Sequence, residues 1–187
     1  MVLVIGEVLF DVFPDYRRIG GAPFNFAFHL QRLGEAVQFV SRIGFDDPGR
    51  EVLAFVERWG LGTEGLQLDP AHPTGMVRVS LDRAAVPTFD ILPDMAYDHI
   101  EINDALQNLL ATPPRLIYFG TLAQRTPQGF RTLQNLLRRR QPETRAFCDI
   151  NLRPESYNDQ VILASLRQTD VLKLSSEELQ VLRGIVG

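Results

Sequence analysis

The segment "RIGGAPFNFAFHLQRLG", residues 18–34, combines two glycines and a proline with an apolar run that has helical spacing. Gly20 and Gly21 can adopt backbone angles closed to other residues, and they allow a ligand to approach the main chain. Pro23 suits the first turn of a helix, where its missing N–H is no loss. The segment therefore predicts a glycine bend followed directly by a helix.

A polar stripe runs along this predicted helix, formed by Asn25, His29 and Arg32 at positions i, i+4 and i+7. Only Asn25 lies in the first turn beside the bend, which makes it a candidate ligand-binding residue. The alternative is a solvent-facing stripe. We favour that alternative for His29 and Arg32, which are further from the bend.

Outside this segment, short apolar runs alternate with helical patterns. Strands that alternate with helices predict a parallel sheet covered on both faces, so the fold class is α/β. The predicted strands are residues 1–5, "AVQFVSRIG" (36–44), "RLIYFGTL" (115–122), "RAFCDI" (145–150) and "DVLKL" (170–174).

The helical patterns between these runs have apolar residues at i, i+3, i+4 and i+7, or at three of these positions. The first follows "DDPG", with Asp47 and Pro48 in cap and first-turn positions. The apolar positions of the three patterns are Val52, Phe55, Val56 and Trp59, then Ile102, Ala105, Leu106 and Leu109, and last Phe130, Leu133 and Leu137.

One stretch, "TGMVRVSLDRAAVPTFDIL" at residues 74–92, interrupts the alternation with two period-two runs around a short turn. This pattern predicts a β-hairpin. Its two faces are Met76, Arg78, Ser80 and Asp82 on one side, and Val77, Val79 and Leu81 on the other. A two-stranded ribbon is marginal alone, so we expect a flap whose apolar face covers a site or a partner lid.

Composition limits the classes of function. At 187 residues, 45% hydrophobic and 22% charged, the chain has the make-up of one globular domain spanning residues 1–187. Its formal charge of −4 gives no general attraction to nucleic acid or to an anionic membrane. The basic run at residues 138–140 ends a predicted helix, where cations complement the helix dipole.

A single cysteine, Cys148, excludes a disulfide within the chain, and no Cys/His spacing is typical of zinc. A reducing cytoplasm is the expected location. The N-terminal apolar stretch is interrupted by Gly6, Glu7 and Asp11, which argues against a signal peptide or a membrane span.

"GGAPFN", with the following "LG" and "IGFDDPG", resembles the first signature of the PfkB carbohydrate kinases, the ribokinase-like sugar kinases. The resemblance continues along the chain through "GEVLFDVFPD", the flap, "AYDHI", "FGTLAQR", "DINLRPE" and "KLSSEEL", and it is strongest to the bacterial fructokinase-like branch. It implies a ribokinase-like parallel-sheet core with helices on both faces. It also implies a small antiparallel β lid, with elements near residues 10–20 and 74–92.

The resemblance assigns a sugar site. It implies that Asp11 accepts hydrogen bonds from sugar hydroxyls and that Gly20, Gly21 and Asn25 form the floor of the site. A carboxylate and an amide together suit vicinal hydroxyls. For Asp11, the alternative is a turn residue at a strand end.

The motif "DINLRP" adds Asn151 and Arg153, which would lie at the carboxyl end of a strand, where open α/β sheets bind ligands. The Arg153 guanidinium offers a planar fork to a phosphate or a sugar oxygen. Arg125 of "FGTLAQR" is assigned either to the same pocket or to the surface.

In "KLSSEEL", the resemblance places Lys173 and Ser175 at ATP and Glu178 at Mg²⁺. The family usually has asparagine where Ser175 stands. Ser-x-x-Glu before an apolar run is also a helix capping box, which needs no metal. Both interpretations stay open, and they can coexist.

A second family signature, a "GAGD"-like turn that carries the catalytic base, does not occur in this sequence. We therefore expect the base beyond residue 187, an incomplete domain that is truncated at its C-terminus, and no activity from this chain alone. A carboxylate that takes the acceptor proton and amides that stabilise the transferring phosphate are central to phosphoryl transfer.

For the intact enzyme, the expected reaction is transfer of the γ-phosphoryl group of ATP to a primary hydroxyl of a ketohexose such as fructose. The alternatives are a 2-keto-3-deoxygluconate kinase, since related kinases share the "DxNxR" pattern, and a sugar-binding module without catalysis. The expected partner is a small-molecule sugar, with neither nucleic acid nor membrane. A homodimer through the β lid is the expected assembly.

Overall fold

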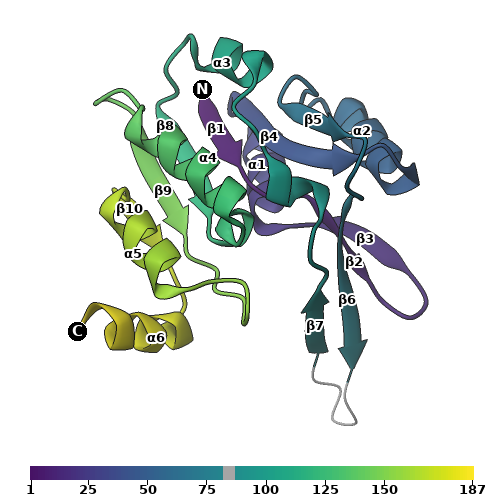
Figure 1. The fold of residues 1–187 in the computed structure, drawn as a ribbon. Helices are drawn as coiled ribbons and strands as arrows, with labels where there is room; N and C mark the ends of the chain where they lie inside the picture. Colours follow the sequence, from purple (N-terminus) through teal and green to yellow (C-terminus); the bar gives the residue numbers. More distant parts are fainter. Residues whose placement is uncertain (82–86) are drawn as a thin grey trace.

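The computed structural model describes residues 1–81 and 87–187, which form two sheets with helices packed around the larger one (Figure 1). The larger sheet has six parallel strands in the order β10, β9, β8, β1, β4 and β5. Five of them lie in the predicted strand segments, and their parallel arrangement is as predicted, whereas β5 was not predicted. Their bounds are β1 (Val2–Ile5), β4 (Val37–Gly44), β5 (Leu66–Asp69), β8 (Leu116–Gly120), β9 (Arg145–Asp149) and β10 (Val171–Lys173).

Strand β1 lies inside this sheet and is buried on both faces. Val2 and Val4 join the apolar cluster that contains residues of the first two helices, whereas Leu3 and Ile5 join the cluster that contains residues of the other four. The helices are α1 (Ala22–Arg32), α2 (Asp47–Trp59), α3 (Asp104–Leu110), α4 (Pro127–Arg138), α5 (Asp159–Arg167) and α6 (Ser176–Val186), with short 3₁₀ helices η1 (Ala96–His99) and η2 (Leu122–Gln124).

Two helix starts differ from the sequence-based expectation. The cap of α2 is Asp46, not Asp47, because Asp46 accepts a hydrogen bond from the Gly49 N–H at 2.8 Å and also bonds the backbone N–H and hydroxyl of Thr74. Ile102 lies before α3, whose cap is Asn103. The local spacing of residues could not reveal this cap, because the cap depends on the tertiary contact between Asp46 and Thr74.

The smaller sheet is the lid. It contains β2 (Leu9–Val12), β3 (Arg17–Gly20), β6 (Gly75–Leu81) and β7 (Pro87–Ile91) in the order β3, β2, β6 and β7. The antiparallel pairing of β6 with β7 confirms the two strands of the predicted hairpin, while its turn, including Asp82, lies outside the described residues. Val77 and Val79 are buried, whereas Arg78 and Ser80 are exposed, as predicted.

The lid is larger than the predicted hairpin. Strand β2 pairs with β6 in parallel, so the two predicted lid segments form one four-stranded sheet that extends away from the larger sheet (Figure 1). Neither segment alone shows this pairing, because it joins residues that are distant in sequence.

No helix in the described part of the chain combines the length and apolar character that a membrane crossing requires.

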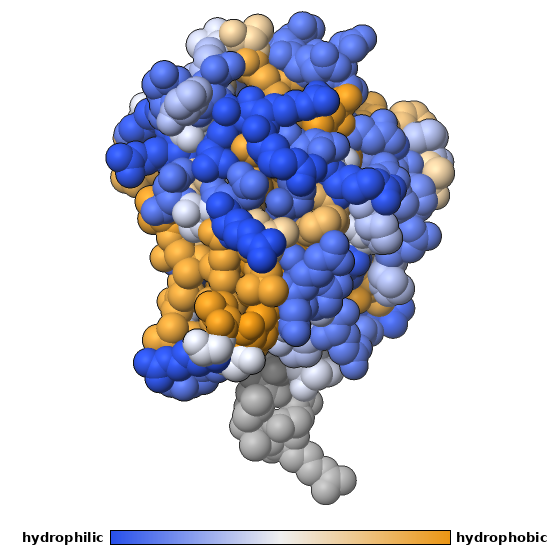
Figure 2. Space-filling view, turned by 60° about the vertical axis from the view of Figure 1, so that its left-hand side comes forward, coloured by the Kyte–Doolittle hydropathy of each residue, from blue (hydrophilic) through white to orange (hydrophobic). Residues whose placement is uncertain are grey.

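A hydrophobic area lies on the side of the molecule that carries β10 and α6 (Figure 2). Strand β10 is an edge strand of the larger sheet, and all three of its residues are exposed. The exposed apolar side chains of these two elements are Val171, Leu172, Leu179, Val181 and Val186. Exposed edges and contiguous apolar patches favour association.

We therefore predict that the 187-residue protein self-associates as its concentration rises and that Val181→Lys weakens this association. A charge at the half-exposed Val181 on α6 would have to be desolvated in any contact through this patch. Sedimentation velocity over a concentration series measures the effect. Leu33→Lys is the control, since Leu33 is 80% exposed at the end of α1. Equal sedimentation of wild type and Val181→Lys would contradict the prediction.

Candidate functional site

A cavity of about 270 Å³ is lined by residues of the lid, of α1 and of the loop after β9. Parallel sheets present ligand sites at the carboxyl ends of their strands, and Asn151 and Arg153 reach the cavity from the end of β9. Five of the seven predicted sugar-binding residues line it: Asp11, Gly21, Asn25, Asn151 and Arg153.

The glycine bend forms one wall of the cavity. Gly21 is the cap of α1 and has φ of 107°, and a Cβ at this position would lie 2.7 Å from the main-chain oxygen of Glu7. Gly20 is not among the lining residues, but it lies directly against Asp11, because a Cβ there would be 2.8 Å from Asp11 Oδ2. The two glycines thus allow the close approach of α1, β2 and the turn after β1.

Asp11 lies within β2, so its interpretation as a turn residue is wrong. Its partner in the antiparallel register is Arg18 on β3, whose Nε lies 3.5 Å from Asp11 Oδ2. Arg18 also lines the cavity, which the sequence analysis did not anticipate. This lid pair presents an acceptor and a cation side by side to a ligand.

Asn151 has φ of 39°, in the left-handed region that few residues other than glycine adopt. Asparagine tolerates this conformation better than most residues. The conformation occurs two residues after β9 ends, where the chain leaves the sheet beside the cavity. Backbone strain at a cavity wall is typical of functional positions.

Arg125 does not line the 270 Å³ cavity, and it is not a surface residue either, since its side chain is only 11% exposed. Its guanidinium donates to both carboxylate oxygens of Asp98, at 2.7 and 2.6 Å, and to the Leu92 carbonyl at 2.7 Å. It lines a neighbouring cavity of about 850 Å³ that also contains Arg153. Arg125 therefore connects the end of the lid to η1.

The capping interpretation of "SSEE" is confirmed. Ser175 caps α6, and its N–H donates to Glu178 Oε2 at 2.7 Å. Glu178 Oε1 accepts from the Leu152 N–H at 2.7 Å, so both carboxylate oxygens are already bound to backbone amides. Glu178 thereby holds the loop that carries Asn151 and Arg153, while its role toward Mg²⁺ stays a prediction.

Lys173, the other residue assigned to ATP, ends β10 and donates to both carboxylate oxygens of Asp149, at 2.9 and 3.0 Å. Asp149 also accepts from the Tyr118 hydroxyl at 2.8 Å. The Lys173 side chain is 58% exposed. Its role toward ATP stays a prediction.

Glu7 is a cavity residue that the sequence analysis missed. Its side chain lines the cavity, yet the residue is only 3% exposed, and its Oε2 has no hydrogen-bond partner among the described residues. Burial raises the pKa of Glu7 from 4.5 to about 7, although the backbone N–H groups of Glu7 and Ala22 and the charge of Arg153 oppose this rise. The sequence signal that could have identified Glu7 is the presence of a glutamate within an otherwise apolar stretch.

The whole chain has relatives of known class. Residues 4–186 match the pfkB family of carbohydrate kinases. The chain is 28% identical to a fructokinase of Salmonella typhimurium and 27% identical to an uncharacterized sugar kinase of Pyrococcus horikoshii. These alignments cover 95% and 96% of this chain but only 61% and 63% of the two relatives, so the chain spans less than two thirds of their length.

Solved structures give the same result for the fold. A fructokinase from Xylella fastidiosa with bound ATP is 26% identical, with a TM-score of 0.85 over 99% of this chain and 61% of that protein. The Pyrococcus horikoshii kinase in complex with ATP is 24% identical, with a TM-score of 0.90 over 98% of this chain and 66% of that protein. The ribokinase-like fold expected from the sequence is therefore confirmed.

We predict that Glu7→Gln makes the free energy of unfolding less dependent on pH. The unfolded glutamate ionises near pH 4.5 and the folded one near 7, so the folded state binds more protons in between. Its contribution to stability is therefore present below pH 4.5 and is lost as pH rises to 7, by about 3 kcal/mol. Urea unfolding from pH 4.5 to 8 measures this. The exposed Glu57→Gln is the control, and parallel curves for Glu7→Gln and wild type would refute the prediction.

Replacing Arg125 tests the buried ion pair. Arg125→Met leaves the Asp98 carboxylate, which is 0% exposed, without its cation, and we expect a loss of about 3 kcal/mol in unfolding free energy. Urea unfolding at pH 7 measures the loss. Arg131→Met, at an exposed position on α4, should change little. A similar small effect for both variants would show that the Arg125 pair does not stabilise the fold.

Proposed function

Because the chain belongs to the pfkB family of carbohydrate kinases, we propose that it carries the sugar-recognition part of an ATP-dependent, fructokinase-like enzyme. The observation that carries this proposal is the cavity between the lid and the sheet. There, polar side chains from three separate parts of the chain converge on one space: Asp11, Asn25, Asn151 and Arg153.

These side chains have the chemistry that a sugar requires. The Asp11 carboxylate accepts hydrogen bonds from hydroxyl groups, the amides of Asn25 and Asn151 both donate and accept, and the Arg153 guanidinium donates. Apolar lid residues, Val77 and Ile91 among them, line the same cavity and suit the carbon face of a sugar ring. A site that must satisfy several buried polar groups rejects analogues that lack the matching hydroxyls.

For the intact enzyme, we propose transfer of the γ-phosphoryl group of ATP to a primary hydroxyl of a ketohexose, with fructose as the first candidate. The support is the likeness to fructokinases from Salmonella typhimurium and Xylella fastidiosa. One observation favours 2-keto-3-deoxygluconate as the alternative. Arg18 and Arg153 both line the cavity, and guanidinium groups suit a substrate carboxylate.

ATP is the proposed phosphoryl donor, with Lys173 and Ser175 as its proposed contacts in this chain. Mg²⁺ would supply charge stabilisation to the phosphates. Glu178 fits that ion poorly as a direct ligand, because both of its carboxylate oxygens accept backbone N–H bonds. We therefore propose for Glu178 only a contact through water, and its main role in this chain is to hold the loop of Asn151 and Arg153.

We further propose that the 187-residue chain does not phosphorylate sugar by itself. Asp149 is held by Lys173 and Tyr118, and Asp11 belongs to a lid strand beside Arg18. Neither carboxylate follows a glycine turn of the kind that supplies amides to a transferring phosphate. The alternative, a sugar-binding module without catalysis, predicts the same inactivity and the same sugar binding, and differs in predicting no turnover from a chain extended through a "GAGD"-like turn.

A homodimer through the lid and a cytoplasmic location remain proposals. In support of the first, β3 and β7 are the two edge strands of the lid sheet, and Phe89 on β7 is 51% exposed. Edge strands pair readily with a second chain. In support of the second, the sole cysteine is a free thiol.

Sugar binding tests the proposed site directly. We predict that Asp11→Asn weakens fructose binding to the chain at least about tenfold, because a charge-assisted hydrogen bond to a hydroxyl becomes a weaker neutral one. Isothermal titration calorimetry measures the affinity. Asp15→Asn, an exposed aspartate in the loop between β2 and β3, is the matched control. Unchanged affinity in Asp11→Asn would remove Asp11 from the site.

An assay of ADP release tests the reaction. Fructose, 2-keto-3-deoxygluconate and a nucleoside are supplied with ATP and Mg²⁺ to the chain and to a version extended through a "GAGD"-like turn. Turnover of a sugar in the extended version alone supports the proposal. Comparable turnover in both contradicts the proposed inactivity of the chain, and activity on the nucleoside alone contradicts both sugar assignments. Sugar binding without turnover in either version favours the non-catalytic module.

A further inference from the structure

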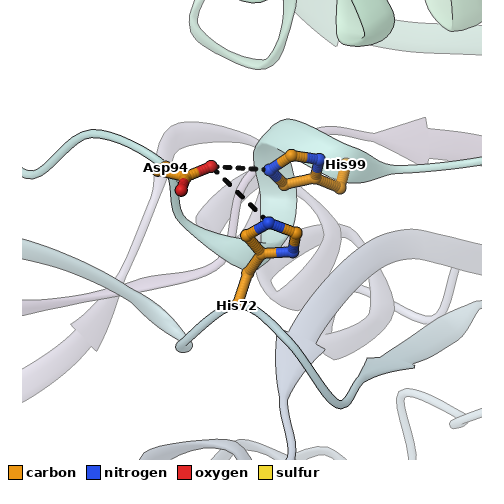
Figure 3. A group of neighbouring side chains, drawn as sticks. All are labelled: His72, Asp94 and His99. Carbon is orange, nitrogen blue, oxygen red and sulfur yellow. Dashed lines mark hydrogen bonds and ion pairs between the residues drawn. The ribbon is translucent and has the colours of Figure 1, made fainter.

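Two of the three histidines in the sequence meet one aspartate at the base of the lid (Figure 3). His72 lies just before β6, Asp94 follows β7, and His99 ends η1. One ligand atom from each residue lies within 4.8 Å of the other two. None of the three residues lines the 270 Å³ cavity, while Asp94 lines the neighbouring 850 Å³ cavity together with Arg125 and Arg153.

Two distances within the cluster are close to those between ligands that share a metal ion, and the shorter of them is a hydrogen bond. Asp94 Oδ1 lies 2.9 Å from His99 Nε2 and 3.6 Å from His72 Nε2. Ligands bound to one Zn²⁺ at its usual bond lengths lie about 3 to 3.5 Å apart. Both imidazoles direct Nε2 toward the same carboxylate oxygen in Figure 3.

The tautomer of His72 is fixed by a neighbour outside the cluster. Asp69 Oδ2 lies 3.0 Å from His72 Nδ1, and the same oxygen accepts from Arg42 Nε at 2.7 Å. A carboxylate paired with a guanidinium is ionised and accepts only, so His72 Nδ1 carries the proton in this bond. Nε2 of neutral His72 therefore has a free lone pair. A carboxylate that orients a histidine in this way is the usual support of a metal-bound imidazole.

The surroundings allow an ion to enter. The Asp94 side chain is 74% exposed, and its ion pairs within the described residues are with these two imidazoles alone. The two rings are stacked with their centroids 3.6 Å apart, so each must rotate for its nitrogen lone pair to point at a shared ion. Both histidine side chains are partly exposed, which leaves room for that rotation.

We propose that His72, Asp94 and His99 bind one divalent transition metal ion, with Zn²⁺ as the best match and water in the remaining positions. Two imidazole nitrogens and one carboxylate favour Zn²⁺ over Mg²⁺ or Ca²⁺, which prefer oxygen ligands. The ion connects the segment that enters β6 to the segment that leaves β7, and so fixes the base of the lid. This proposal does not depend on the proposed kinase function.

Calorimetric titration of the metal-free 187-residue protein with Zn²⁺ tests the site. We expect one site per chain, affinity at least about tenfold weaker in His72→Gln and in His99→Gln, and no change in His29→Gln. His29 is the third histidine of the chain and is exposed on α1, so it is a matched control. The proposal would be overturned if His72→Gln and His99→Gln each bound Zn²⁺ as tightly as the wild type does, or if the wild type bound no Zn²⁺.

A measurement on the wild type keeps the test independent of how the variants fold. In NMR spectra of the imidazole nitrogens, added Zn²⁺ should shift the resonances of His72 and His99 and leave those of His29 in place. The same titration with Mg²⁺ should shift none of them. Zn²⁺ shifts at His29 equal to those of the other two, or no shifts at all, would refute the site.

Discussion

The structure depends on the close packing of two turns at the carboxyl end of β1: the turn that follows this strand and the glycine bend before α1. No space is left between these turns for a side chain. A Cβ on Gly6 would lie 2.5 Å from Cγ of Pro23, and one on Gly21 would lie 2.7 Å from the Glu7 carbonyl oxygen. Both glycines also have positive φ, of 153° and 107°. This contact places the start of α1 against the end of the sheet, and it brings Asn25 and Glu7 to the same cavity.

Five strands of the larger sheet could be predicted because they are short apolar runs separated by helical spacing, a pattern that depends on local sequence alone. The sixth, β5, was missed because its sequence "LQLD" contains only two apolar residues. The lid could be predicted only in part. Alternation in residues 74–92 indicates a hairpin, but the parallel pairing of β2 with β6 depends on how the larger sheet positions both segments. The cap of α2 was misplaced by one residue for a similar reason, since Asp46 is chosen by its contact with Thr74.

The candidate site, like the lid, could be predicted only in part. Family-like motifs led to Asp11, Asn25, Asn151 and Arg153, which line one cavity. Motif matching could not show that Arg125 pairs with buried Asp98, or that Glu178 also accepts a hydrogen bond from Leu152 in the loop after β9. It also overlooked Glu7, because the local sequence does not show that this residue is buried beside the cavity. The cluster of His72, Asp94 and His99 has no metal-like spacing and forms only where the lid meets the sheet.

The parallel pairing of β2 with β6 also has a consequence for the order of folding. It joins Leu9 to Gly75, so the chain must close a long loop before the lid has its central pair of strands. Strands β1, β4 and β5 close that loop when they pair, because β2 follows β1 and β6 follows β5. The pairing of the core strands therefore brings β2 and β6 together and sets the register of the lid.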